Sequence, residues 1–187
     1  MCRVYNNGNN VFWIMGPTAS GKTTLANIIL SKLRENDTLA IHYDGDEVRD
    51  FFGLSLGFEK ADRLKVVKTI VHLSNKAIDA GLNVIISALT ANQDARDYVI
   101  RNVKNLILIY LECSIKKCMQ RDTKGLYEKA ANKEINTVIG YNDEYLAPEN
   151  PDIIINTDEK SVESSALDLM ERLRERGIIK KPFQNLI

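Results

Sequence analysis

The residues best suited to chemistry lie near the N-terminus, in the stretch VFWIMGPTASGKTTLANIIL, residues 11–30. Residues 16–23 match the phosphate-binding pattern G-x-x-x-x-G-K-[ST] at every fixed position. An apolar, strand-like run precedes the pattern and helix formers follow it, which is the context that the pattern requires. Successive backbone N–H groups and the positive end of the following helix attract phosphate. We therefore expect this loop to hold a nucleoside triphosphate, ATP with Mg²⁺.

Two side chains of the loop have specific expected roles. Lys22 can reach the outer phosphates, and the hydroxyl of Thr23 can bind Mg²⁺. The alternative is a chance glycine-rich turn before a surface helix, which the flanking strand and helix disfavour. The remaining residues expected to contact the nucleotide here are Gly16, Thr18, Ala19, Ser20, Gly21 and Thr24.

A second group of charged residues lies in YDGDEVRDFFG, residues 43–53. Asp44 and Asp46 follow an expected strand, and ligands of open parallel sheets bind at the carboxyl ends of strands. Two carboxylates beside a metal-bound triphosphate can hold Mg²⁺ or take a proton from an attacking hydroxyl. Arg49 lies one helical turn beyond Asp46 and could clamp an anionic acceptor. The alternative is an ordinary Asp-Gly turn with a solvated cap.

The elements that must position these residues alternate along the chain. Strands are predicted over residues 11–15, 39–43, 82–87, 106–112 and 152–156, and helices over 22–34, 60–80, 94–103, 115–121 and 161–176. Short apolar strands between helices indicate a parallel sheet covered on both faces. The predicted fold class is α/β: a P-loop NTPase with three α/β/α layers and a five-stranded parallel sheet.

The chain divides into a loose N-terminal segment, residues 1–10, and one kinase domain, residues 11–187. Residues 122–151 form a polar excursion rich in Lys, Glu, Asn and Pro, which predicts a mobile lid.

Composition excludes several classes of protein. The 187 residues carry 25 basic and 25 acidic side chains, so no global field recruits nucleic acid or a membrane surface. No apolar run approaches the ~20 residues that a membrane helix needs. Three cysteines without metal-binding spacing indicate reduced thiols in a cytoplasmic protein. A GTP-dependent switch is disfavoured, because DFFG at residues 50–53 has no N-K-x-D partner motif downstream.

The ordered motifs resemble those of adenylylsulfate (APS) kinases, P-loop enzymes that transfer the γ-phosphoryl group of ATP to the 3′-hydroxyl of adenylyl sulfate. The resemblance covers about residues 11–160. After the phosphate loop it comprises, in family order, DGDEVR, LGF at 56–58, DR at 62–63, RDTKGLYEKA at 121–130 and GYNDEYLAPENPDIIINT at 140–157.

The resemblance implies further roles. Asp44 would be the catalytic base or the metal-positioning carboxylate, with Asp46 beside it. Phe58 would stack on the acceptor base, while Arg49 and Arg63 would bind its anionic groups. Lys124, in the lid, would approach the phosphates on closure. Arg121, just before the lid, would lie near the adenine of ATP. The family also tends to form homodimers.

This chain departs from the family on the acceptor side. Val66 replaces an Asn that holds the acceptor nucleotide, and Val138 replaces a Phe that closes an aromatic sandwich on its adenine. Thr90 replaces a Ser after the third strand. The loss of a stacking ring and the loss of a hydrogen-bonding side chain should each weaken the binding free energy of a purine base by about 1–3 kcal/mol. The family pattern still implies adenylyl sulfate as the acceptor. Because the acceptor side is altered, cytidine diphosphoramidate or another nucleotide with a free 3′-hydroxyl is the alternative. A protein that only binds ATP is an alternative of another class.

Overall fold

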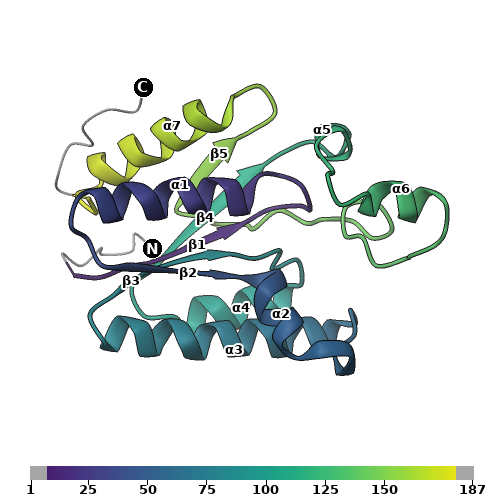
Figure 1. Ribbon diagram of the computed structural model, residues 1–187, viewed down its shortest axis with the longest axis horizontal. Coiled ribbons are helices and arrows are strands. Elements are labelled where there is room, and N and C mark those ends of the chain that lie inside the picture. Colours follow the sequence, from purple (N-terminus) through teal and green to yellow (C-terminus); the bar gives the residue numbers. More distant parts are fainter. Residues whose placement is uncertain (1–7, 180–187) are drawn as a thin grey trace.

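In a computed structural model, which describes residues 8–179, a five-stranded parallel sheet lies between two layers of helices (Figure 1). The strand order is β2-β3-β1-β4-β5, and every neighbouring pair is parallel. This confirms the predicted fold class. The strands are β1 (Val11–Met15), β2 (Ala40–Asp44), β3 (Asn83–Ser87), β4 (Leu106–Glu112) and β5 (Ile153–Asn156).

The five predicted helices are present, and their ends differ from the predicted ones by at most one residue. They are α1 (Lys22–Glu35), α3 (Lys60–Asp79), α4 (Gln93–Asn102), α5 (Ile115–Gln120) and α7 (Val162–Glu175). The sequence did not predict α2 (Gly45–Phe51), α6 (Leu126–Ala131) or the single 3₁₀ turn η1 (Gly53–Ser55). Figure 1 shows α1 and α7 on one face of the sheet, α3 and α4 on the other, and α5 and α6 beyond one end of it.

The central strand β1 explains the layered core. All five of its residues are buried, so it carries apolar side chains toward both helical layers. Phe12 and Ile14 pack on the side of α1 and α7, whereas Trp13 packs with Ile70 of α3 on the opposite side. A strand buried on both faces is therefore continuously apolar, which is why its position could be predicted.

Two side chains fix the loop that leaves β3. Trp13 is fully buried, and its Nε1–H donates to Thr90 Oγ1 at 2.9 Å. Arg96 of α4 is also buried, and its Nε donates to the Thr90 carbonyl at 3.0 Å. The Arg96 guanidinium donates further to the carbonyls of Ala91 (2.7 Å), Ala147 (3.4 Å) and Leu146. It thereby ties the loop after β3 to the chain that returns toward β5.

Other predictions concern the start of the chain and the cysteines. Residues 1–7, and with them Cys2, lie outside the described residues; Asn10 is buried and its backbone N–H donates to Asn83 Oδ1 at 3.0 Å. Cys113 and Cys118 are buried free thiols, as expected. In the part of the chain that the structure describes, no helix is long and apolar enough to cross a membrane.

Replacing Arg96 by Met should lower the free energy of unfolding by about 2–3 kcal/mol, because four carbonyls lose a charged donor. Arg101→Met is the matched control on the same helix. Arg101 is exposed and pairs with Asp97 at 3.5 Å, so its loss should cost less than about 0.5 kcal/mol. Chemical denaturation measures both values, and equal values would contradict the structural role of Arg96.

Candidate active site

The predicted site residues gather around one cavity of about 1040 Å³ at the carboxyl ends of the strands. All of them except Gly16 line it. A pocket for one small ligand is typically about 300–1,000 Å³. The cavity is thus large enough for a phosphoryl donor and an acceptor together. It is bounded by the phosphate loop, α2, α3 and the predicted lid.

The phosphate loop is shaped by two glycines that no other residue could replace without strain. A Cβ on Gly16 would lie 2.8 Å from the carbonyl oxygen of Leu111, so a side chain cannot be accommodated. Gly21 has φ +94° and is the residue before α1. Ala19 also takes a left-handed conformation, with φ +60°. Together these conformations bring the start of α1 to the edge of the cavity.

The ammonium group of Lys22 is held by the loop itself. Its Nζ donates to the carbonyls of Pro17 at 2.7 Å and Gly16 at 3.0 Å. Burial lowers the pKa of Lys22 to about 8, although the charges of Asp46 and Asp44 act in the opposite direction. A desolvated ammonium of this kind is stabilised by an anion, which a polyphosphate would supply.

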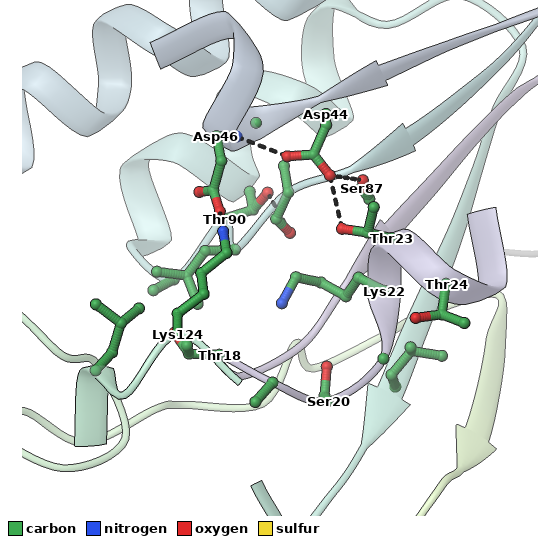
Figure 2. Close-up of a pocket in the computed structure, with 18 of the residues that line it drawn as sticks. Thr18, Ser20, Lys22, Thr23, Thr24, Asp44, Asp46, Ser87, Thr90 and Lys124 are labelled. Atoms are coloured by element: carbon green, nitrogen blue, oxygen red, sulfur yellow. Dashed lines mark hydrogen bonds and ion pairs between the residues drawn. The ribbon is translucent and has the colours of Figure 1, made fainter. Parts of the chain in front are cut away.

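The carboxylate of Asp44 is the meeting point of three elements (Figure 2). Its Oδ2 accepts from Ser87 Oγ at 2.6 Å and from Thr23 Oγ1 at 2.7 Å, and its Oδ1 accepts from the backbone N–H of Asp46 at 2.8 Å. The last bond caps α2. Burial acts to raise the pKa of Asp44, but the bonds from Ser87, Thr23 and Asp46 outweigh it and leave the pKa below its usual value. Asp44 therefore stays ionised at neutral pH.

The pair formed by Asp44 and Thr23 suits Mg²⁺, which prefers carboxylate and hydroxyl oxygens. Within residues 8–179 no cluster of three or more His, Cys, Asp and Glu side chains could hold a metal without a substrate. Mg²⁺ in kinases takes few protein ligands, because phosphate and water supply the remaining positions. The donor set at the start of α1 fits that arrangement.

An aromatic ring beside two cations also lines the cavity. The ring of Phe58 is 51 % exposed, with Arg49 at 4.7 Å and Arg63 at 5.7 Å from its centroid. Burial, followed by the like charge of Arg49, lowers the pKa of Arg63, yet a guanidinium remains charged. Two neighbouring guanidinium groups that line the cavity favour an anionic ligand here.

The three residues that depart from the family motif have different surroundings. Val66 of α3 is buried in the main core, and Val138 is buried in a small apolar cluster with Cys118 and Tyr127. Both also line the cavity. Thr90 lines it too, but its hydroxyl already accepts the bond from Trp13. The two valines thus place aliphatic side chains in the cavity lining at positions where the family motif has Asn and Phe.

Residues 122–151 contact the body of the protein at several points. Lys124 Nζ lies 2.6 Å from Asp46 Oδ2, in an exposed ion pair visible in Figure 2. Arg63 Nη2 donates to the Thr137 carbonyl at 2.9 Å, and Tyr127 Oη donates to the Thr18 carbonyl at 3.1 Å. The segment therefore lies over both halves of the cavity.

Arg121, just before this segment, has its own anchor. Its Nη2 donates to the Thr157 carbonyl at 2.7 Å, and the residue lines the cavity.

Sequence reasoning missed two residues near Asp44. Ser87, the last residue of β3, donates to the Asp44 carboxylate, and His42 of β2 lies 2.8 Å from the Ser87 hydroxyl. The position of Ser87 at the carboxyl end of a strand was the available signal. No sequence signal marked His42, a lone histidine in an apolar strand.

A parallel sheet in this strand order, with a phosphate loop between β1 and α1 and a carboxylate after β2, defines a P-loop kinase. The chain also matches the adenylylsulphate kinase family model over residues 8–156. It belongs to that family of nucleotide kinases.

Individual relatives support the assignment. The chain is 35 % identical to the adenylyl-sulfate kinase of Oceanobacillus iheyensis over 176 residues, which cover 93 % of this chain and 88 % of that protein. It is also 35 % identical to the adenylyl-sulfate kinase of Rippkaea orientalis over 170 residues, 91 % of this chain and 94 % of that protein. Among solved structures, the Mycobacterium tuberculosis APS kinase in complex with AMPPNP and APS superimposes with a TM-score of 0.81 at 27 % identity, covering 89 % of this chain and 98 % of that one.

Replacing Lys22 by Ala should preserve the fold but lower turnover by a factor of at least ~10², because a positioned charge on the transferring phosphoryl group is lost. The exposed Lys76 at the end of α3 provides a control, and Lys76→Ala should retain full activity. A coupled assay of ADP release measures both. Normal turnover by folded Lys22→Ala protein would refute the assignment of this site.

Proposed function

We propose that this protein transfers the γ-phosphoryl group of ATP to the 3′-hydroxyl of adenylyl sulfate. The observation that carries the proposal is the Asp44 carboxylate, held by Thr23 of the phosphate loop and facing the same cavity as the Arg49–Phe58–Arg63 cluster. The family membership and the relatives named above support the choice of reaction.

On the donor side, the chain supplies positive charge and fixed backbone donors. The triphosphate lies along residues 16–23, where Lys22 exchanges its loop carbonyls for phosphate oxygens. Thr23 and Asp44 would hold Mg²⁺, which would offset the negative charge that develops on the outer phosphates. Arg121 borders the adenine.

On the acceptor side, the chain orients the attacking hydroxyl. Arg49 and Arg63 hold the anionic group beyond the ribose, and Phe58 stacks on the base. Because hydrogen bonds keep Asp44 ionised, its carboxylate accepts a hydrogen bond from the 3′-hydroxyl and aligns it. Positioning of both substrates thus contributes more than strong basicity.

The segment 122–151 acts as a lid that excludes water from the closed site. Lys124 reaches Asp46 through an exposed ion pair, which is worth only about 0–1 kcal/mol and is easily exchanged for a phosphate contact. The lid therefore brings a second cation to the donor phosphates when it closes.

Asp44→Asn tests whether the protein is an enzyme rather than an ATP-binding module. Asn keeps the size and caps α2 equally well, so the fold should persist. We expect turnover to fall by at least ~10² while binding of an ATP analogue changes little. The control is Asp79→Asn, which removes a surface carboxylate paired with Lys104. Equal turnover by wild type and Asp44→Asn would contradict the proposed role.

A second acceptor is favoured by one specific observation. The cavity is lined by the ring of Phe58 and by the aliphatic side chains of Val66 and Val138, which replace the polar and aromatic residues of the family motif. Such a pocket encloses a base, but its aliphatic side chains make no hydrogen bonds to the polar edge of that base. A smaller pyrimidine would therefore also be accepted. Cytidine diphosphoramidate combines a pyrimidine with an anionic tail for Arg49 and Arg63.

Competition among adenylyl sulfate, cytidine diphosphoramidate and simple nucleoside diphosphates, with ATP and Mg²⁺, measures the preference. We expect specificity constants within about tenfold for the purine and pyrimidine acceptors, because so little of the base edge is read. A preference above ~10³ for adenylyl sulfate, about 4 kcal/mol, would show that other residues recognise adenine. The same preference for the cytidine compound would establish the second acceptor.

A further inference from the structure

A chain of three side chains runs beneath the reacting centre. His42 Nε2 lies 2.8 Å from Ser87 Oγ, and Ser87 Oγ lies 2.6 Å from Asp44 Oδ2. Asp44 and Ser87 are paired across β2 and β3, and His42 precedes Asp44 by two residues. Side chains two residues apart on a strand share a face. All three therefore lie on the face of the sheet that α1 covers.

The direction of the hydrogen bonds follows from the chemistry of the end group. An ionised carboxylate only accepts, so the single hydroxyl proton of Ser87 must point to Asp44. The Ser87 oxygen is then left as an acceptor, and His42 must donate to it from Nε2. Nε2 carries a hydrogen in this arrangement whether the imidazole is neutral or charged. The order of donation is His42 to Ser87 to Asp44.

We propose that His42 and Ser87 are positioning residues that fix the Asp44 carboxylate for phosphoryl transfer. Ser87 holds Oδ2 on the side opposite to the capping bond at Oδ1, and His42 holds the Ser87 hydroxyl in the only rotation that serves Asp44. This inference rests on the proposed function, in which Asp44 orients the acceptor hydroxyl and the metal-bound phosphates.

Burial strengthens the hold of Ser87 on the Asp44 carboxylate. Ser87 is 2 % exposed and Asp44 is 7 % exposed, so water does not readily replace either partner. Without Ser87, Asp44 Oδ2 keeps the bond from Thr23 but loses its second donor among the described residues, and the carboxylate gains freedom to rotate about its terminal torsion. A misplacement of a fraction of an ångström at a reacting group lowers turnover without preventing binding.

A double-mutant cycle tests the proposal through turnover. Ser87→Ala should lower kcat by ~10-fold with the KM for ATP changed less than ~2-fold, and His42→Leu should lower kcat by ~4-fold. The double variant should match Ser87→Ala, because residues in one network are not additive. His42→Gln offers an amide N–H at a similar reach and should recover most of the activity. His72→Leu, at the exposed histidine of α3, should behave as wild type.

Nuclear magnetic resonance of ¹⁵N-histidine-labelled wild-type protein without ligands provides a readout independent of activity. At pH 8 the tautomer of His42 can be read, because burial lowers the pKa of its imidazole and keeps the ring neutral. His42 should carry its proton on Nε2, and its signal should move in Ser87→Ala while that of His72 does not. A proton on Nδ1 of His42 would overturn the proposed direction.

The two experiments separate this inference from the proposed function. A wild-type protein that transfers phosphate to none of the acceptors would refute the proposed function, whereas the His42 tautomer would still decide the direction of the bonds. An active wild type with multiplicative effects of His42→Leu and Ser87→Ala would refute the positioning role alone. Thermal melts of each variant establish that the folded protein is being compared.

Discussion

The hydrogen bonds that converge on the Asp44 carboxylate join three parts of the chain. Thr23 begins the helix after the phosphate loop, Ser87 ends β3, and the Asp46 amide begins α2. Each donor belongs to an element whose position is set by the buried sheet and its helical layers. Because the three donors favour the charged carboxylate over the protonated one, the same contacts that assemble the site also set its electrostatics.

One half of the cavity is shaped mainly by the backbone and the other mainly by side chains. The half at the phosphate loop relies on backbone geometry, since Gly16 leaves no space for a side chain and Gly21 has a left-handed conformation. The half around Phe58 relies on side chains, chiefly that ring and the two arginines beside it. Backbone-built sites tolerate few changes, whereas a side-chain-built site changes by single substitutions. This contrast explains how one chain keeps the phosphate loop of its family and differs at Val66.

The features that could be predicted from the sequence are those set by residues close together in the chain. The strands and long helices were predictable because their apolar spacing is local, and the phosphate loop because its pattern is contiguous. Short helix α2 depends on a single cap from Asp44, which leaves no periodic signal. The sequence around Arg96 is that of an exposed charged residue on a helix, whereas in the structure Arg96 is buried and donates to the carbonyl of Leu146, 50 residues away. The pairing of His42 with Ser87 requires the register of β2 and β3, which no local pattern contains.

Because β2 lies at the edge of the sheet, the part of the site that it carries should unfold at a lower free energy than the phosphate loop. Among residues 8–179, β2 pairs with β3 alone, while the phosphate loop follows the central strand β1, which pairs on both sides. Edge elements open locally at lower free energy than the centre of a domain. Fraying of β2 would carry Asp44 away from Thr23 and leave the loop intact. If Asp44 has the proposed role, partial unfolding of β2 would abolish turnover under conditions in which the phosphate loop keeps its shape.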